Sequence, residues 1–156
     1  MLGHMSMLVI SVGVPGSGKT TFLKRLARER GYSYVATDDI REELAGDAAD
    51  QSRNADVWKE AHARVAKALA AGEDVAFDAT FANARERRAF IAFAREMGAG
   101  RIEALWFDVP LESAKERNRG RERAVPEHVL ERMHAFIRKD PPTEAEGLDM
   151  VTRFAD

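Results

Sequence analysis

Short apolar runs alternate with segments of helical periodicity from one end of the chain to the other. The runs with β-strand character cover residues 7–12, 33–36, 74–78, 102–107 and 149–154. Between them the apolar residues recur at helical spacing, and this alternation is typical of a parallel sheet with helices on both faces. We therefore predict an α/β fold built on a five-stranded parallel sheet.

Several of the predicted helices have recognisable ends. Gly72 follows a helical pattern over 58–71, and a glycine readily takes the left-handed conformation just beyond a helix. Asn83 and Glu86 have the spacing of a capping box, which opens a helix that should stop at Gly98. These ends favour separate helices between the strands.

The last long helix is predicted to start at Pro126, because the first helical position tolerates proline. Its apolar positions are Val129, Leu130, Met133, Phe136 and Ile137. Their spacing predicts one stripe along the helix, which we expect to be buried. Two prolines at 141–142 end this helix, and a shorter helix is predicted over 111–118.

The composition fits one ordinary globular domain. The chain has 156 residues, of which 45% are apolar and 32% charged. This length and apolar fraction are enough to bury a core. Because its net charge is −2, the chain as a whole is not a polycation that would bind every nucleic acid non-specifically. A nucleic-acid contact would have to be local. The lack of cysteine excludes disulfides, thiolate zinc sites and thiol catalysis.

No apolar run approaches the length of a membrane span, since the longest covers only residues 7–12. We therefore expect a cytoplasmic protein without a membrane partner. We also expect a monomer. Residues 1–6 resemble a vector remnant or a disordered start. A single domain is expected over 7–156, because no linker or repeat interrupts that stretch.

The strongest motif lies between the first predicted strand and the first predicted helix. Residues 13–20 read Gly-Val-Pro-Gly-Ser-Gly-Lys-Thr. Such glycines let the backbone approach a phosphate, so that successive N–H groups and a helix N-terminus point at it. Lys19 should then reach the β- and γ-phosphates of ATP, and the Thr20 hydroxyl a Mg²⁺ ion. The candidate nucleotide-binding residues are Gly13, Pro15, Gly16, Ser17, Gly18, Lys19 and Thr20.

Carboxylates follow two other strands, at the sheet edge where open α/β folds bind ligands. Asp38 follows the second strand, where a base could take the proton of a hydroxyl that attacks the γ-phosphate. Alternatively, Asp38 or Asp39 caps the helix that starts near Ile40, and Asp39 with Glu42 has capping-box spacing. The spacing alone leaves both functions open.

Arg41 and Asp78 are two further candidates near this edge. Arg41 stands about one helical turn after Asp38, and its planar guanidinium suits a phosphate on the molecule that accepts the γ-phosphate. The alternative is an ordinary solvated arginine on a helix. Asp78 ends the third strand, where an acidic residue can hold Mg²⁺ through water or orient Thr20. A simple turn at the strand end is the alternative for Asp78.

The densest basic cluster spans residues 115–123 and contains four arginines in seven residues around Gly120. It predicts a mobile lid that closes over ATP and neutralises charge that develops in phosphoryl transfer. Arg117 and Arg121 are four residues apart and share a face if the helix continues. A solvated charge run is the alternative.

With these motifs the chain resembles the polynucleotide 5′-hydroxyl kinase family over nearly its whole length. The matching segments are residues 13–20, Asp-Asp-Ile-Arg at 38–41, Asp-Ala-Thr at 78–80, Phe-Asp-Val-Pro at 107–110, Arg-Asn at 117–118 with Arg121, and Ala-Val-Pro at 124–126. Many relatives have asparagine where this chain has Phe81. The resemblance implies a P-loop kinase fold with an arginine-rich lid.

The resemblance also implies ATP-dependent transfer of the γ-phosphate to 5′-hydroxyl ends of DNA or RNA, in nucleic-acid end healing or repair. Asp38 would be the general base, and Arg41 would contact the phosphate that flanks the acceptor nucleoside. Lys19 and Arg121 would stabilise the transferring phosphates, and Arg117 would belong to the lid. A functional link to a separate phosphatase or ligase would fit this activity.

Two other functions share part of the pattern. A P-loop kinase that phosphorylates a sugar, a nucleoside or an antibiotic would also have the loop and an aspartate after the second strand. A nucleotide-dependent switch would explain the loop, but not the pair of Asp38 and Arg41. An acceptor screen separates the kinases, and the switch predicts no acceptor-stimulated release of ADP.

Overall fold

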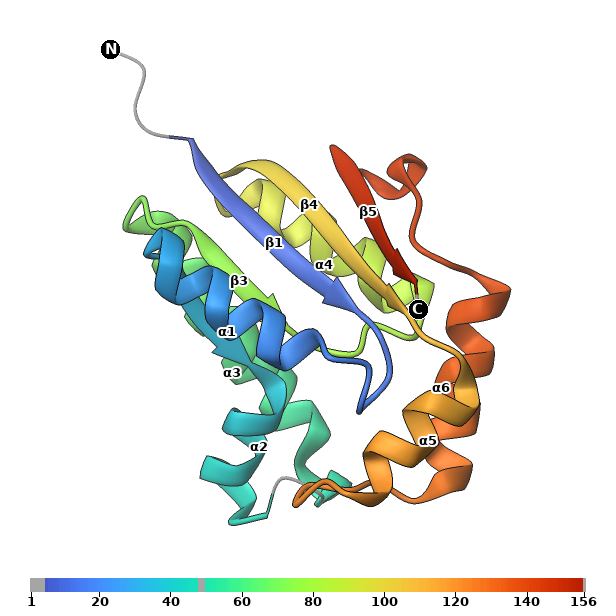
Figure 1. Ribbon diagram of the computed structural model, residues 1–156. Helices are drawn as coiled ribbons and strands as arrows, with labels where there is room; N and C mark the ends of the chain where they lie inside the picture. Colours follow the sequence, from blue (N-terminus) through green and yellow to red (C-terminus); the bar gives the residue numbers. More distant parts are fainter. Residues whose placement is uncertain (1–4, 48–49, 156) are drawn as a thin grey trace.

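The five predicted strands form one parallel sheet. In the computed structural model, which describes residues 5–47 and 50–155, the sheet has the order β2-β3-β1-β4-β5 (Figure 1). The strands are β1 (Ser6–Val12), β2 (Ser33–Ala36), β3 (Val75–Asp78), β4 (Ala99–Asp108) and β5 (Met150–Ala155). Every neighbouring pair is parallel, so all carboxyl ends meet at one edge.

Helices cover both faces of the sheet, as the alternating pattern predicts. The helices are α1 (Lys19–Arg30), α2 (Thr37–Ala45), α3 (Asn54–Ala70), α4 (Ala84–Glu96), α5 (Leu111–Arg119) and α6 (Glu127–Lys139). Two single 3₁₀ turns, η1 (Gln51–Arg53) and η2 (Glu144–Glu146), connect elements. Figure 1 shows α1 in front of the sheet and α4 behind it, while α5 and α6 stand beside the carboxyl ends of the strands.

The core accordingly has two parts. A smaller cluster joins α1 to one sheet face through residues such as Leu23, Val9 and Leu105. A larger cluster on the other face joins α3, α4 and α6, with Phe77 and Phe90 among its members. The alternation of strand residues between these two clusters follows from the two-residue repeat of a β-strand.

The expected helix ends are confirmed where a glycine or Asn83 sets them. Gly72 and Gly98 follow α3 and α4 with positive φ, and Gly31 ends α1 in the same way with a left-handed φ of 70°. Asn83 caps α4, because its side-chain oxygen accepts hydrogen bonds from the backbone N–H groups of Arg85 and Glu86.

Other boundaries differ from the sequence prediction. The helix expected over 58–71 begins at Asn54, and β4 begins at Ala99 where residue 102 was expected. β1 begins at Ser6, inside the segment set aside as a vector remnant, of which residues 1–4 lie outside the described part. The buried stripe of α6 is also only partly present, because Leu130 and Ile137 are buried while Phe136 is 49% exposed.

A buried arginine holds the loop that follows β3. The Arg87 guanidinium is fully buried and donates hydrogen bonds to both carboxylate oxygens of Glu146, at 2.7 and 2.6 Å. It also donates to the carbonyl oxygens of Phe81 and Asp140. Phe81 has a φ of 48°, which is unfavourable for a bulky residue. The satisfied charge of Arg87 therefore helps to keep this strained loop in place.

None of the helices in the described ranges is both long and apolar enough to cross a membrane.

Candidate functional site

The loop over residues 13–20 turns tightly at the carboxyl end of β1 and leads directly into α1. Gly16 and Gly18 have φ values of 84° and 96°, a region that side chains disfavour. A Cβ atom on Gly16 would also lie only 3.0 Å from the carbonyl oxygen of Ala114 in α5. The glycines therefore let the loop pass beneath α5, and α1 begins at Lys19.

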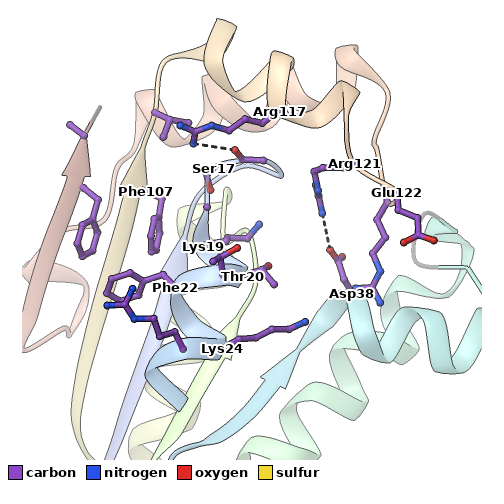
Figure 2. Close-up of a pocket in the computed structure, with 18 residues that line it drawn as sticks. Ser17, Lys19, Thr20, Phe22, Lys24, Asp38, Phe107, Arg117, Arg121 and Glu122 are labelled. Atoms are coloured by element: carbon purple, nitrogen blue, oxygen red, sulfur yellow. Dashed lines mark hydrogen bonds and ion pairs between the residues drawn. The ribbon is translucent and has the colours of Figure 1, made fainter. Parts of the chain in front are cut away.

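A main cleft of about 900 Å³ opens above this loop (Figure 2). Among the side chains that the structure describes, two buried polar atoms have no hydrogen-bond partner, Ser17 Oγ and Arg121 Nη1. Both residues line the main cleft. A hydroxyl oxygen and a single guanidinium nitrogen without hydrogen-bond partners at one cavity fit an anionic ligand that accepts hydrogen bonds.

Lys19 is the buried cation of this cleft, with only 6% of the residue exposed. Burial lowers the pKa of its ammonium group, and Arg121 acts in the same direction, although Asp78 and Asp38 oppose the shift. An ammonium that has lost much of its hydration gains strongly from a polyanion beside it. The position of Lys19 is thus well suited to a phosphate chain.

Thr20, Asp78 and Tyr34 form a hydrogen-bonded group below the loop. The Thr20 hydroxyl donates to Asp78 Oδ2 at 2.7 Å, and the Tyr34 hydroxyl donates to the same oxygen at 2.5 Å. Burial and the Asp78 carboxylate raise the pKa of Tyr34 far above its usual value, so the phenol remains a donor. The sequence brought Asp78 and Thr20 together as candidates, but it gave no sign of Tyr34, which belongs to no recognisable motif.

Asp38 and Arg41 lie on one face of α2, one turn apart, as expected. Arg41 Nη1 donates to Asp38 Oδ1 at 2.8 Å, while its Nε and Nη2 donate to Asn54 Oδ1 of α3. Arg41 is buried, which excludes the alternative of a solvated helix arginine. Across the main cleft, Arg121 Nη2 lies 4.0 Å from Asp38 Oδ2, and Figure 2 shows the two side chains facing each other.

Neither Asp38 nor Asp39 caps α2, which corrects one alternative considered for the sequence. The helix starts directly after β2 with Ala36 as its N-cap residue, and no side chain caps it. Asp39 Oδ1 instead accepts a hydrogen bond from Arg123 Nη1 at 3.1 Å, and Glu42 pairs with the same guanidinium. Asp39 and Glu42, which have capping-box spacing, thus both contact Arg123 of the basic cluster.

The basic cluster begins as a helix and continues as a strap. α5 ends at Arg119, and the strap over residues 120–125 then crosses toward α2. Asn118 is buried and holds the strap through two hydrogen bonds with the backbone of Val125, at 2.7 and 3.0 Å. Arg117 Nη1 lies 3.5 Å from the Gly16 carbonyl oxygen, at the limit of a hydrogen bond.

The arginines of the cluster differ in their surroundings. Arg119 pairs with Glu127 at 2.7 Å, away from the main cleft, and Arg123 binds Asp39 and Glu42. Arg117, Arg121 and Arg123 line the main cleft. The cluster therefore forms one wall of this cavity and connects it to α2.

A side pocket of about 200 Å³ lies next to the main cleft, on the side of α3 and α6. It is lined by Pro15, Thr37, Asp38, Arg41, Asn54, Trp58, Thr80, Phe81, Ala82, Asn83, Glu86, Arg123, Val125, Met133 and Phe136. Asp38 and Arg123 line both cavities, so the Asp38 carboxylate stands where they meet. The sequence did not reveal the aromatic part of this lining, Trp58 and Phe81, whose ring centroids lie 5.5 Å apart.

The parallel sheet, the glycine-rich loop at the start of α1 and the adjoining arginine-bearing segment define a P-loop kinase domain. The chain belongs to the AAA domain family, whose model matches residues 8–139. A P-loop kinase fold of this kind binds a nucleotide such as ATP.

Solved structures show the same fold. The chain matches one in the Pnkp1/Rnl/Hen1 RNA repair complex with a TM-score of 0.78 and 28% identity, over 88% of this chain and 46% of that one. A gluconokinase from Sinorhizobium meliloti matches with a TM-score of 0.61 and 19% identity, over 99% and 84% of the two chains. Shikimate kinase from Acinetobacter baumannii gives a TM-score of 0.63 and 15% identity, over 98% and 86%.

These comparisons confirm the P-loop kinase fold and the resemblance noted in the sequence. The chain spans less than half the length of the RNA repair protein that it matches. The two small-molecule kinases, below 25% identity, support the fold alone.

The lowered pKa of Lys19 predicts that ATP binding takes up a proton in alkaline solution. Phosphates beside the ammonium should raise its pKa again, so between the free and the bound values the complex holds more protons than the free protein. ATP affinity should therefore fall as the pH rises through this window, which begins below the ordinary lysine value of 10.5.

Calorimetry in buffers with different ionisation enthalpies measures this uptake, which should reach at most about one proton per site. A Lys19→Arg variant is the control, because a guanidinium stays protonated throughout this range. Equal heats in all buffers for the unmodified protein would contradict the prediction.

Proposed function

We propose that this protein transfers the γ-phosphate of ATP to the 5′-hydroxyl group of a DNA or RNA end. The main support is the position of Asp38, a residue that lines both the main cleft and the side pocket. A hydroxyl in the side pocket would lie beside Asp38, which can accept its proton while the oxygen bonds to the γ-phosphorus. The bond from that phosphorus to the β-phosphate bridging oxygen breaks, and ADP leaves.

The donor side of the proposal rests on the main cleft. Lys19, Arg121 and the Ser17 hydroxyl supply donors and positive charge at the place where a phosphate chain would lie. Thr20 and Asp78 offer hard oxygen ligands, which suit Mg²⁺. No group of three or more His, Cys, Asp or Glu side chains in the described residues could hold a metal ion. Mg²⁺ would thus be held mainly by the phosphates, with the Thr20 hydroxyl and water, and would neutralise their charge.

The acceptor side rests on the chemistry of the side pocket. Trp58, Phe81, Met133 and Val125 present apolar surfaces, which suit a flat nucleobase better than a polyol with many hydroxyl groups. Arg41 uses three of its five N–H donors on Asp38 and Asn54, which leaves two for an acceptor phosphate. A nucleoside that carries a 3′-phosphate combines both features, and so does the first residue of a polynucleotide.

The direct test is incubation with labelled ATP and Mg²⁺ and a panel of acceptors. We expect label on 5′-hydroxyl oligonucleotides of DNA or RNA, and little on sugars or antibiotics at equal concentration. Label only on a small molecule would replace the proposal by a small-molecule kinase. ATP binding without any acceptor-dependent release of ADP would favour a nucleotide-dependent switch.

Arg41 should make a nucleoside 3′-phosphate a better acceptor than the bare nucleoside. A hydrogen-bonded charge pair contributes about 1.5–3 kcal/mol, so kcat/KM should differ by about 10-fold or more. Arg41→Gln should remove most of this ratio. Because both acceptors are measured with each variant, any disturbance of Asp38 cancels in the ratio.

Arg53→Gln is a matched control, since Arg53 pairs with Asp56 and lines neither cavity. It should keep the ratio of the unmodified protein. If the unmodified protein itself shows no preference for the 3′-phosphate, the polynucleotide acceptor is wrong and a small-molecule acceptor is favoured.

A further inference from the structure

Phe136 breaks the burial pattern of the helix that carries it. It occupies the apolar stripe of α6, yet it is 49% exposed while Leu130 and Ile137 on the same stripe are buried. Within residues 5–47 and 50–155 the Phe136 ring contacts no other aromatic ring, although Trp58, Phe77, Phe81 and Phe90 form a continuous cluster nearby. A large apolar ring that the core does not use needs another explanation.

Phe136 stands at the opening of the side pocket. It contributes to the lining together with Met133 and Val125, and its remaining surface faces solvent. The side pocket holds about 200 Å³, which is below the 300–1,000 Å³ of sites that enclose drug-sized ligands. It can therefore enclose no more than the terminal unit of a strand, and a second unit would lie outside it.

The charges at this rim do not favour a contact that depends on many ion pairs. The charged residues of the lining are two acids, Asp38 and Glu86, and two bases, Arg41 and Arg123. Asp38 pairs with Arg41, and Arg123 already binds Asp39 and Glu42. An apolar ring at the opening is then the group best placed to hold the next unit, and every nucleobase has a flat face that stacks on such a ring.

We propose that Phe136 is the stacking platform for the second nucleobase of the acceptor strand, counted from the 5′-hydroxyl end. This inference rests on the proposed function. The first nucleoside lies in the side pocket with its 3′-phosphate at Arg41, and the base after that phosphate stacks on Phe136. Because the ring offers no hydrogen-bonding groups, the platform accepts any base and sets a preference for acceptor length without reading sequence.

Two acceptors of different length separate this function from a structural one. A nucleoside 3′-phosphate ends before the platform, whereas a dinucleotide reaches it. Phe136→Ala should lower kcat/KM for the 5′-hydroxyl dinucleotide by about 5- to 100-fold, the range given by base stacking on an aromatic ring. It should leave kcat/KM for the nucleoside 3′-phosphate within about 2-fold of the unmodified value. Phe136→Trp should restore kcat/KM for the dinucleotide. Met97→Ala, another exposed apolar residue outside both cavities, is the matched control.

An acceptor with an abasic second residue completes the test. For the unmodified protein, the abasic residue should lower kcat/KM by as much as Phe136→Ala lowers it with the intact dinucleotide. In the Phe136→Ala variant, the abasic residue should lower kcat/KM no further. Equal losses on both acceptor lengths, or independent losses from the two changes, would overturn the platform while leaving the kinase in place. If the unmodified protein labels no oligonucleotide at all, the proposed function fails and the platform fails with it.

Discussion

Replacement of Arg121 by alanine is expected to slow phosphate transfer by about 10³-fold, because an arginine that stabilises charge in phosphoryl transfer contributes at least this much. Arg121 Nη1 is buried at the main cleft without a hydrogen-bond partner. Its Nη2 lies 4.0 Å from Oδ2 of Asp38, the residue proposed as the base. Single-turnover transfer at saturating ATP and acceptor measures the loss directly.

The neighbouring arginines supply the controls for Arg121. Arg119→Ala should stay within a few-fold of the unmodified rate, because Arg119 is exposed and pairs with Glu127 outside the main cleft. The loss of rate for Arg123→Ala should lie between those of Arg119→Ala and Arg121→Ala, since this change releases the contact between the strap and α2. A larger loss for Arg119→Ala or Arg123→Ala than for Arg121→Ala would show that the arginine assigned to the transferring phosphate is the wrong one.

The fold was accessible from the sequence because each element carries a local signal. Strand residues alternate between two helix-covered faces, and a glycine or an asparagine marks several helix ends at the expected positions. The phosphate-binding loop needs glycine at fixed positions for backbone reasons, so its spacing is visible in the sequence.

The parts of the site that the sequence did not reveal depend on partners far away in the chain. Tyr34 reaches Asp78 across 44 residues, and Arg123 reaches Asp39 across 84. Neither pair has a fixed spacing, because the contact depends on how β2, β3 and the strap come together in space. Such tyrosines and arginines cannot be told from ordinary surface residues by pattern alone.

Two local patterns were misleading for identifiable reasons. Asp39 and Glu42 have capping-box spacing, but α2 starts too early for Asp39 to be its cap, and both carboxylates face Arg123. Phe136 has the spacing of a buried residue, but the core beneath α6 is filled by Leu130 and Ile137. Helical periodicity predicts which residues share a face, and the neighbouring elements decide how much of that face is covered.

Asp38→Asn is expected to lower phosphate transfer by at least about 10²-fold, the usual loss when a positioned base is removed. The asparagine side chain has nearly the same size, and its oxygen can still accept the hydrogen bond from Arg41. It cannot take the proton of the attacking hydroxyl. The affinity for ATP with Mg²⁺ should stay close to that of the unmodified protein, because Lys19, Thr20 and the loop are unchanged.

Asp39→Asn is the matched control for this prediction, one residue away on the same helix. Its carboxylate lies 3.1 Å from Arg123 and is partly exposed, so its loss should reduce stability by at most about 1 kcal/mol. Its effect on the rate should be much smaller than that of Asp38→Asn, because Asp39 does not line the main cleft or the side pocket. ATP affinity, melting temperature and single-turnover transfer should be measured for both variants. An Asp38→Asn protein that transfers phosphate at nearly the full rate would exclude Asp38 as the base, even if the ATP site passes every other test.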